Sequence, residues 1–425
     1  MWSNGKMSFR ARSARNLFFL VLLFPLILNA SPIYFPEGKK VTGLLDLDTG
    51  FFSIGAELKT GFLAPEGDLD LEFFRGDPSI SHTNEKRGKF RIDRLMLIPQ
   101  LNIQEIIKAY AELEATTQRD QTNSTFFREG HLSFYFPYHF FMKVGLEDRF
   151  ISPEFMAVNS SRGDNKKLTE VYPINGTAFW EDEDLGLTFG GDHPVTEGST
   201  LYWRGSVTNG LSLQHDELTR NQIYPIFHDD RHSQNLNIDL SDNKEAGMGF
   251  GFKHAFSRPI SVDILGFFFN KSLNMQDVTF LTTVIPGYSS INRTSYRTGV
   301  NNEMNVSDFN LFTQYIYAVD GAVKRDGFYI QPSYVIGLNS ESAFFNSIRL
   351  LYRFNTLDVR ANDVSDNLPT SPFTWDRQTH SVAVNLQIHS YVLFRNEYHF
   401  NLEATGADRN KVSNNEFLSQ LEVRF

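Results

Sequence analysis

The stretch GHLSFYFPYHFFMKVGLE, residues 130–147, determines the fold prediction. Apolar side chains occupy every second position from Leu132 to Phe136, and the alternation resumes from Phe140 to Leu146. A period of two is typical of a β-strand, because successive side chains point to opposite faces of a sheet. Only Pro137–His139 separates the two stretches. We therefore predict two antiparallel strands that are joined by a tight turn.

The same period recurs along most of the chain. Further alternating segments are Leu201–Thr208, Ile348–Asn355 and Ser381–Ile388. Many of the predicted strands are roughly ten residues long, which is the length that a tilted membrane strand needs, whereas strands of globular proteins average about 5–6 residues. In a soluble β-sandwich the apolar face would pack on a second sheet, and in a membrane barrel it would contact lipid.

The lengths of the connections favour the membrane barrel. Pro137–His139 and Ser257–Pro259 are short, whereas Arg149–Asp182, Gly210–Glu245 and Ala361–Gln378 are long. Outer-membrane barrels have short periplasmic turns and long external loops. We predict an all-β fold, a transmembrane antiparallel β-barrel.

A count of crossings gives about sixteen strands, with fourteen and eighteen as open alternatives. Both ends of an even-stranded barrel lie on the periplasmic side, so strand directions must agree along the whole chain. To satisfy this, we assign a first strand to Gly50–Thr60 and a further crossing to Asp277–Ile285. The second assignment requires a long periplasmic connection from Pro286 to Asn305.

The first thirty residues have the layout of a secretory signal peptide. Four basic residues (Lys6, Arg10, Arg12 and Arg15) precede the apolar block Leu17–Leu28, and Ala30 offers a small residue for cleavage. This block is short for a bilayer-spanning helix, which needs about 20 residues, although a retained anchor helix is the alternative. We predict a signal peptide at 1–30 and a single barrel domain at 31–425, in which 31–88 is an N-terminal segment with a possible first strand.

Charge and composition exclude several functions. The chain has 40 basic and 50 acidic residues; without the four basic residues of the signal, the net charge becomes −14. No nucleic-acid partner is expected, because such proteins need basic faces. The chain has no cysteine, which excludes disulfides, thiolate metal sites and a thiol nucleophile.

The last nine residues also alternate. Phe417, Leu421, Val423 and Phe425 share one face of the predicted terminal strand, and Gln420, Glu422 and Arg424 share the other. This ending resembles the terminal strand of bacterial outer-membrane barrels, whose final aromatic residue belongs to the signal that the barrel-insertion machinery recognises. The resemblance assigns that role to Phe425 and predicts outer-membrane lipid as a partner.

Several motifs resemble the phosphate-selective porin family (porins O and P). They are Phe90–Arg94, Ala111–Glu114, Lys143–Leu146 with Pro153–Glu154, Ser206–Gly210, Leu350–Phe354 with Leu357–Asp358, Ala383–Leu386 and Asn396–Tyr398. The resemblance covers most of the mature chain. It implies a sixteen-stranded barrel in the outer membrane, a homotrimer, and diffusion of small solutes.

Strand alternation predicts which charged residues line the pore. The basic candidates are Arg91, Lys143, Arg204, Lys253, Arg349, Arg353, Arg395 and Arg424; the acidic ones are Asp93, Glu112, Glu114, Glu147, Glu397, Glu403 and Glu422. Eight basic against seven acidic residues make a mixed interior, whereas the family's phosphate selection depends on rows of arginine and lysine. Anionic solutes stay a candidate class, and no phosphate-binding residue is carried over. The alternative is that these charges only solvate the interior and pair across strands.

The third external loop is a candidate constriction. General porins fold this loop back into the channel, and here it spans Asp148–Asp182. Its candidate charges are Arg149, Glu154, Arg162, Lys166 and Lys167, with an acidic stretch at Glu181–Asp184. Opposed charges at a narrow point would orient a passing solute. An external cap is an equally supported alternative.

No enzyme, metal or cofactor motif stands out. The segment His228–His232 matches no ligand spacing and falls in a long polar loop. Gly247, Gly249 and Gly251 alternate with Met248 and larger apolar residues, which predicts small side chains on the interior side. We predict a porin without catalytic residues or cofactors; the alternatives are a non-conducting adhesin or receptor, and an outer-membrane hydrolase that uses His228 and Asp229.

Overall fold

The computed structural model describes the strands and part of their connections. The described residues are 52–65, 89–103, 106–116, 124–150, 183–210, 213, 243–257, 260–284, 291–338, 345–361, 376–389, 392–404, 411–412 and 415–424. The predicted signal peptide lies outside them.

The described strands form one antiparallel sheet. Its long strands are β1 (Phe52–Pro65), β2 (Lys89–Ile103), β3 (Ile107–Thr116), β4 (Ser124–Phe136), β5 (Phe140–Asp148), β6 (Glu183–Thr196), β7 (Ser199–Thr208), β8 (Glu245–Ser257), β9 (Ile260–Ser272), β10 (Thr294–Val306), β11 (Phe309–Asp320), β12 (Val323–Gly337), β13 (Ser347–Ala361), β14 (Asp376–His389), β15 (Val392–Ala404) and β17 (Glu416–Arg424). The two-residue β16 (Lys411–Val412) only extends the edge near β15. Sixteen long strands confirm the predicted number.

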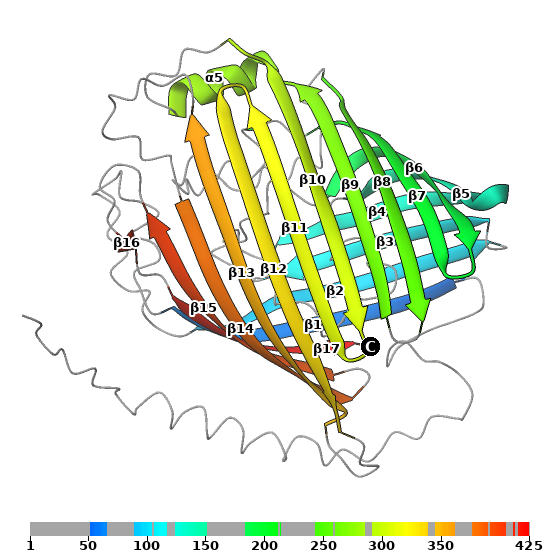
Figure 1. Ribbon diagram of the computed structural model, residues 1–425, viewed down its shortest axis with the longest axis vertical. Coiled ribbons are helices and arrows are strands. Elements are labelled where there is room, and N and C mark those ends of the chain that lie inside the picture. The colour runs from blue at the N-terminus through cyan, green and yellow to red at the C-terminus, as the bar shows by residue number, and fades with distance from the viewer. Residues whose placement is uncertain are drawn as a thin grey trace, which may run out of the picture. The chain divides into compact units, whose positions relative to one another are not determined.

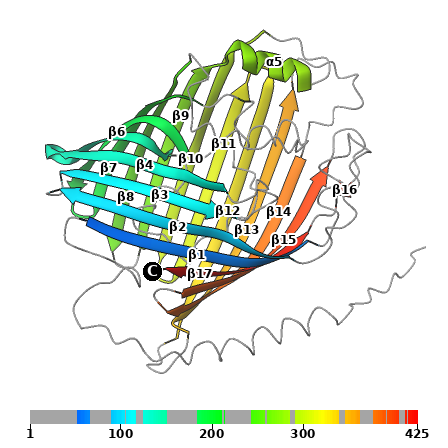
Figure 2. The ribbon, with the colours of Figure 1, turned by 180° about the vertical axis from the view of Figure 1, so that it is seen from behind.

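The sheet closes on itself (Figures 1 and 2). Each long strand pairs with the next, and β1 pairs with both β2 and β17, with Glu57 opposite Arg424 at the closing pair. A closed barrel has no free edge, so every strand can form hydrogen bonds on both sides. The first predicted strand, Gly50–Thr60, is confirmed as β1 over its described part.

The polarity of the barrel is reversed relative to a soluble protein. Large apolar side chains such as Leu132, Val144 and Leu350 are exposed on the outside. Their polar neighbours, for example Ser133 and Arg349, are buried on the inside. The alternation therefore separates an apolar outer face from a polar inner face, as in a transmembrane barrel.

Connections are sorted by length between the two ends of the barrel. At the short-turn end lie 104–106, 137–139, 197–198, 258–259, 307–308, 338–346 and 390–391. Strands are joined at the long-loop end by 66–88, 117–123, 149–182, 209–244, 273–293, 362–375 and 405–415. Two connections depart from the sorting. The connection 338–346 is long for the short-turn end, and Gly321–Ala322 between β11 and β12 is a two-residue turn at the long-loop end, in which Gly321 has a positive φ of 65°.

The predicted strand Asp277–Ile285 is wrong: Met275–Val284 forms the helix α5, which lies at the long-loop end (Figure 1). Asn274 and Asp277 cap it reciprocally, because the Asp277 amide donates to Asn274 Oδ1 at 2.7 Å and the Asn274 amide donates to Asp277 Oδ2 at 3.2 Å. The missing crossing is β10, so the predicted periplasmic connection Pro286–Asn305 is also wrong. No helix among the described residues is long and apolar enough to span a membrane.

Candidate functional site

The interior of the barrel contains a buried network of charges at the long-loop end. Asp320 at the end of β11 accepts hydrogen bonds from Ser295 (2.7 Å), Arg297 (3.3 Å) and Arg325 (2.5 Å). Asp320 and both arginines are almost completely buried. We call Ser295, Arg297, Asp320 and Arg325 the Asp320 network. Two cations around one carboxylate leave a local excess of positive charge, which Glu245 reduces because it lies near Arg297.

The loop that follows β5 enters this charged region with its first residue. Arg149 Nη2 lies 2.5 Å from Asp184 Oδ2 of β6, and Arg149 Nε lies 3.1 Å from Glu245 Oε1 of β8. All three side chains are buried. A buried guanidinium between two carboxylates fixes the start of the loop against the inner wall. The loop therefore begins by turning into the barrel, as the predicted constriction requires.

Phe150, the next residue, packs on the inner face of β8 and β9. Its ring centroid lies 4.9 Å from that of Phe269. A Cβ atom at Gly249 would approach the Phe150 ring to 2.9 Å, and one at Gly251 would clash with the Tyr202 ring. These glycines face the interior, as predicted, and their lack of a side chain leaves the space that the aromatic rings fill.

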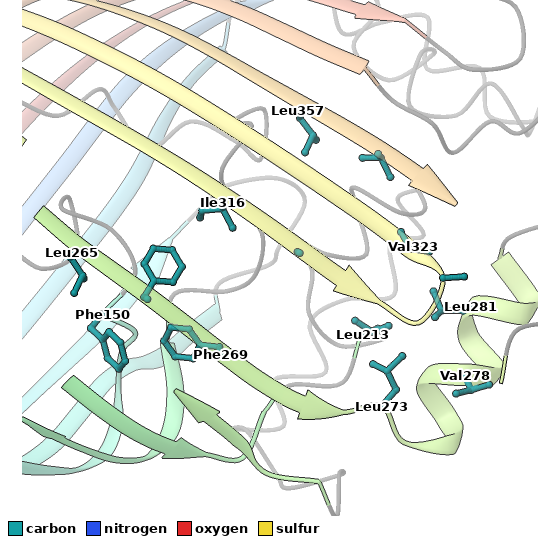
Figure 3. Packing of buried hydrophobic residues seen from close by; sticks show 14 of the residues in the cluster. Phe150, Leu213, Leu265, Phe269, Leu273, Val278, Leu281, Ile316, Val323 and Leu357 are labelled. Carbon is teal, nitrogen blue, oxygen red and sulfur yellow. The ribbon is translucent and has the colours of Figure 1, made fainter. Parts of the chain in front are cut away.

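Phe150 belongs to a larger apolar cluster inside the barrel, which extends from α5 at the long-loop end to Tyr202 in β7 (Figure 3). Its members are Phe150, Tyr202, Leu213, Leu265, Phe267, Phe269, Leu273, Val278, Leu281, Ile316, Ala318, Ala322, Val323, Leu357 and Val359. The strands contribute Leu265, Ile316 and Leu357, whereas Leu213 comes from the β7–β8 connection and Leu281 from α5. Loop and helix residues therefore fill part of the interior at this end.

Asp277 ties α5 to the neighbouring connection. Its Oδ1 accepts a hydrogen bond of 2.7 Å from the Leu213 amide. Burial raises the pKa of Asp277 above its usual range, although nearby Lys271 and the amides of Leu213 and Asn274 act in the opposite direction. This single side chain caps α5 and also holds the β7–β8 connection over the apolar cluster.

A second buried network joins the first and last strands. Glu422 of β17 lies 3.7 Å from Lys59 Nζ of β1 and 2.7 Å from Arg395 Nη1 of β15. Arg395 also donates to Gln420 at 3.1 Å. We call Lys59, Arg395, Gln420 and Glu422 the closing network, because it spans the strands that close the barrel.

Charges on the short-turn half of β6–β9 are more accessible. Arg204 pairs with Asp192 at 2.7 Å and Lys253 pairs with Asp263 at 3.2 Å. Tyr202 lies between the two pairs: its hydroxyl donates to Asp263 at 2.6 Å, and the Arg204 and Lys253 cations lie 5.0 and 5.2 Å from its ring centroid. The side chains of Lys253 and Asp192 are 53% and 51% exposed. We call these five residues the charged strip.

The pore-lining candidates fall into three groups. Those buried on the inner face are Glu112, Arg349, Arg353, Arg395, Glu397 and Glu422. Those on the inner face with partial or full exposure are Lys143, Arg204 and Lys253. The side chains of Arg91, Asp93, Glu114, Glu147, Glu403 and Arg424 lie outside the description, as does Phe425. Contact of these residues with a solute path stays a prediction.

The pairing of β1 with β2 departs from simple alternation. The register of β1 against β2 shifts so that Lys59 lies opposite Arg94 and Thr60 opposite Ile92, which makes Asp93 the extra residue of a β-bulge.

Of the constriction-loop candidates, Arg149 is described, whereas Glu154, Arg162, Lys166 and Lys167 lie outside the described residues.

Sequence reasoning missed the members of the Asp320 network and Glu245, one of the two partners of Arg149. The other partner, Asp184, belongs to the predicted acidic stretch of the same loop. Arg149 and Glu245 are 96 residues apart, so no local pattern links them. A usable signal was present in the alternation of β11 and β12, which puts Asp320 and Arg325 on the polar face. The segment His228–His232 lies outside the described residues, among which no group of three or more potential metal ligands occurs.

The sequence matches no protein-family model and no curated protein sequence. Among solved structures, it is similar to the outer membrane channel DcaP of Acinetobacter baumannii, with 10% identity over 89% of this chain and 99% of that chain and a TM-score of 0.54. It is also similar to OprB of Pseudomonas putida, with 8% identity over 88% of this chain and 94% of that chain and a TM-score of 0.57. A third similar structure is OmpF of Salmonella typhi, with 8% identity over 88% of this chain and 97% of that chain and a TM-score of 0.56.

The fold is that of outer-membrane porins. At these identities the likeness concerns the architecture, and the solute is left open. None of the three structures is described as a phosphate-selective porin, so the narrower sequence resemblance stays a prediction.

Proposed function

We propose that this protein is a bacterial outer-membrane porin, which lets small hydrophilic solutes diffuse passively through its barrel. The observation that carries the proposal is the reversed polarity of a closed sheet. Leu132 and Leu350 are exposed outside, while Ser133 and Arg349 are buried inside. Such a barrel is stable in lipid and offers a polar interior to solutes.

The start of the β5–β6 loop supports a narrowing of the channel. Arg149 and Phe150 are fixed to the inner wall by ion pairs and by aromatic packing. A loop that is held inside the barrel limits the size of the solutes that pass. We include the remaining candidates of this loop, Glu154, Arg162, Lys166 and Lys167, as part of the proposed constriction.

The apolar cluster supports the second candidate, a non-conducting surface barrel that acts as an adhesin or receptor. Phe150 and α5 fill part of the interior with side chains. If the remaining cross-section is closed, function would depend on the external loops. A channel and a closed barrel differ in one direct measurement, which is ion current.

The lack of cysteine in the native chain gives a clean test. Purified protein should produce stepwise currents in a planar lipid bilayer. In Lys253→Cys, a charged membrane-impermeant thiol reagent should lower the step size, because the Lys253 side chain is inward and half exposed. The matched control is Phe252→Cys, the adjacent outward position. An absence of steps, or equal sensitivity of both variants, would contradict the channel.

Several further expectations belong to this proposal. Homotrimeric assembly, cleavage after Ala30 and recognition of Phe425 by the barrel-insertion machinery stay predictions. So does the absence of enzymatic activity, which a hydrolase assay on wild type and His228→Ala would test.

A further inference from the structure

The charged strip differs from the other inner charges in its accessibility. Asp320 and Arg325 are completely buried, so a solute cannot reach them without a rearrangement. In the charged strip, the Lys253 and Asp192 side chains are about half exposed. These two side chains carry opposite charges and come from strands that are separated by β7.

The register of the strands sets the distance between the backbone positions of these two charged residues. Asp192 lies opposite Tyr202 of β7, and Lys253 lies opposite Thr200, two residues further along the same strand. With a strand spacing of about 4.8 Å and a rise of about 3.4 Å per residue, the two Cα atoms are roughly 12 Å apart. The side chains converge on Tyr202, because Lys253 Nζ and the Arg204 partner of Asp192 both lie over its ring.

The existing ion pairs leave binding capacity on both charges. The Lys253 ammonium has three N–H donors, and its described ion pair is the one with Asp263. The Asp192 carboxylate has several acceptor sites, and Arg204 Nη1 uses one. Exposed ion pairs of this kind are weak, so a solute carboxylate or ammonium can join them at little cost.

The geometry points to a solute with a carboxylate at one end and an ammonium at the other. We propose that the charged strip binds short zwitterionic peptides, with the peptide carboxylate at Lys253 and the peptide ammonium at Asp192. An extended tripeptide spans about 10 Å, which is comparable with the roughly 12 Å between the Cα atoms of Asp192 and Lys253. This inference rests on the proposed channel function, because the peptide must reach the interior.

Tyr202 acts as a positioning residue in this arrangement. Gly251 provides the space in which its ring lies against the wall, and the ring separates the two ion pairs. The hydroxyl bond to Asp263 fixes the carboxylate that holds Lys253. Without the ring, Lys253 and Arg204 would be free to approach each other's carboxylates, and the separated charges would be lost.

The experiment compares three probe peptides as inhibitors of KCl current in a planar bilayer. Triglycine carries both charges, N-acetyltriglycine carries only the carboxylate, and triglycine amide carries only the ammonium. In the wild-type channel, we expect triglycine to reduce the current at concentrations about two- to five-fold lower than either single-charge peptide, the range expected from one additional exposed ion pair.

Two substitutions assign the ends of the peptide. In Lys253→Gln, triglycine should lose its advantage over triglycine amide, because the carboxylate no longer has a partner. In Asp192→Asn, triglycine should lose its advantage over N-acetyltriglycine. Matched controls are Lys244→Gln, which precedes β8 at the long-loop end, and Asp326→Asn, which lies on the outer face of β12 together with the exposed residue Phe328. Both controls should keep the wild-type order of the three peptides.

The possible failures are distinguishable. Missing KCl steps in the wild type would contradict the channel itself. Normal KCl steps with equal inhibition by all three peptides would overturn only the peptide site, and so would a triglycine advantage that persists in both substituted channels. Each variant is compared with its own KCl current, which also reports whether it has folded and inserted.

Discussion

The Asp320 network and the apolar cluster lie at the same end of the barrel, yet different parts of the chain build them. The network comes from the adjacent strands β10, β11 and β12. The cluster needs Phe150 from a loop and Leu281 from α5 in addition to the strands. Strand pairing alone therefore places the network, whereas the cluster forms only when the connecting segments fold inward.

This difference separates the wall of the barrel, which the strands form, from its contents, by which we mean the loop and helix residues of the apolar cluster such as Phe150, Leu213 and Leu281. Members of the network lie on strands that the closed sheet holds on both sides. Members of the cluster cover the inner wall and reduce the free cross-section. We expect substitutions in the network to affect global unfolding, and substitutions in the cluster to affect local opening and conductance.

The largest effect is expected for Asp320→Ala. The substitution leaves the buried guanidinium groups of Arg297 and Arg325 without their shared carboxylate. Loss of one partner from a buried ion pair costs about 3–5 kcal/mol. The free energy of unfolding, measured by urea titration in detergent or lipid, should fall by this amount.

The matched control for Asp320→Ala is Asp358→Ala in β13. Asp358 pairs with Arg360, whose side chain is well exposed, so the loss should be at most about 1 kcal/mol. Equal losses for the two substitutions would contradict a special role for the buried network.

Sequence patterns predicted the wall better than the contents. Strands such as β4, β5, β13 and β14 alternate strongly, because lipid on one side and polar surroundings on the other impose a strict period. β10 escaped prediction because its outer face carries the polar residues Thr294, Thr298 and Asn302. These polar residues interrupt the apolar row of Tyr296, Val300 and Met304, so the period of two is weak.

The misassigned helix has a local physical reason. The β-branched residues of Asp277–Ile285 favour a strand by propensity. The capping pair of Asn274 and Asp277, and the burial of Val278 and Leu281 one turn apart, favour a helix. Tertiary contacts decided between the two, and they involve Leu213, which is distant in the sequence. Distance in the sequence also explains why Glu245, 96 residues from Arg149, was not predicted as its partner.

An intermediate effect is expected for Leu281→Ala in α5. Leu281 is completely buried in the apolar cluster, and truncation of a buried leucine costs about 2–3 kcal/mol where the surroundings can relax. Because α5 belongs to a connection, the loss should appear as faster hydrogen exchange of the α5 amides and as larger conductance steps.

The control for Leu281→Ala is Thr282→Ala, the adjacent exposed position, which should change stability by less than about 0.5 kcal/mol. If Leu281→Ala lowered global unfolding stability as strongly as Asp320→Ala, the cluster and the wall would be one cooperative unit. The distinction between wall and contents would then be lost.

The smallest effect concerns the charge of Asp277. Because burial raises the pKa of Asp277, the folded state favours the protonated carboxyl more than the unfolded state does. The resulting stabilisation is complete below the ordinary value of about 4 and is lost as the pH rises through the raised folded pKa. Protection of the α5 amides from hydrogen exchange, corrected for the intrinsic rate, should therefore decline as the pH is raised from about 4.

Asp277→Asn should remove this pH dependence, because the amide does not ionise. The variant should also lower protection at low pH, since the Asn side chain offers one acceptor for the two amides of Leu213 and Asn274. The same substitution at the exposed turn residue Asp308 should leave the profile of α5 unchanged. A pH profile confined to α5 would support local folding of the interior contents, because the Asp320 network of the wall would not follow it.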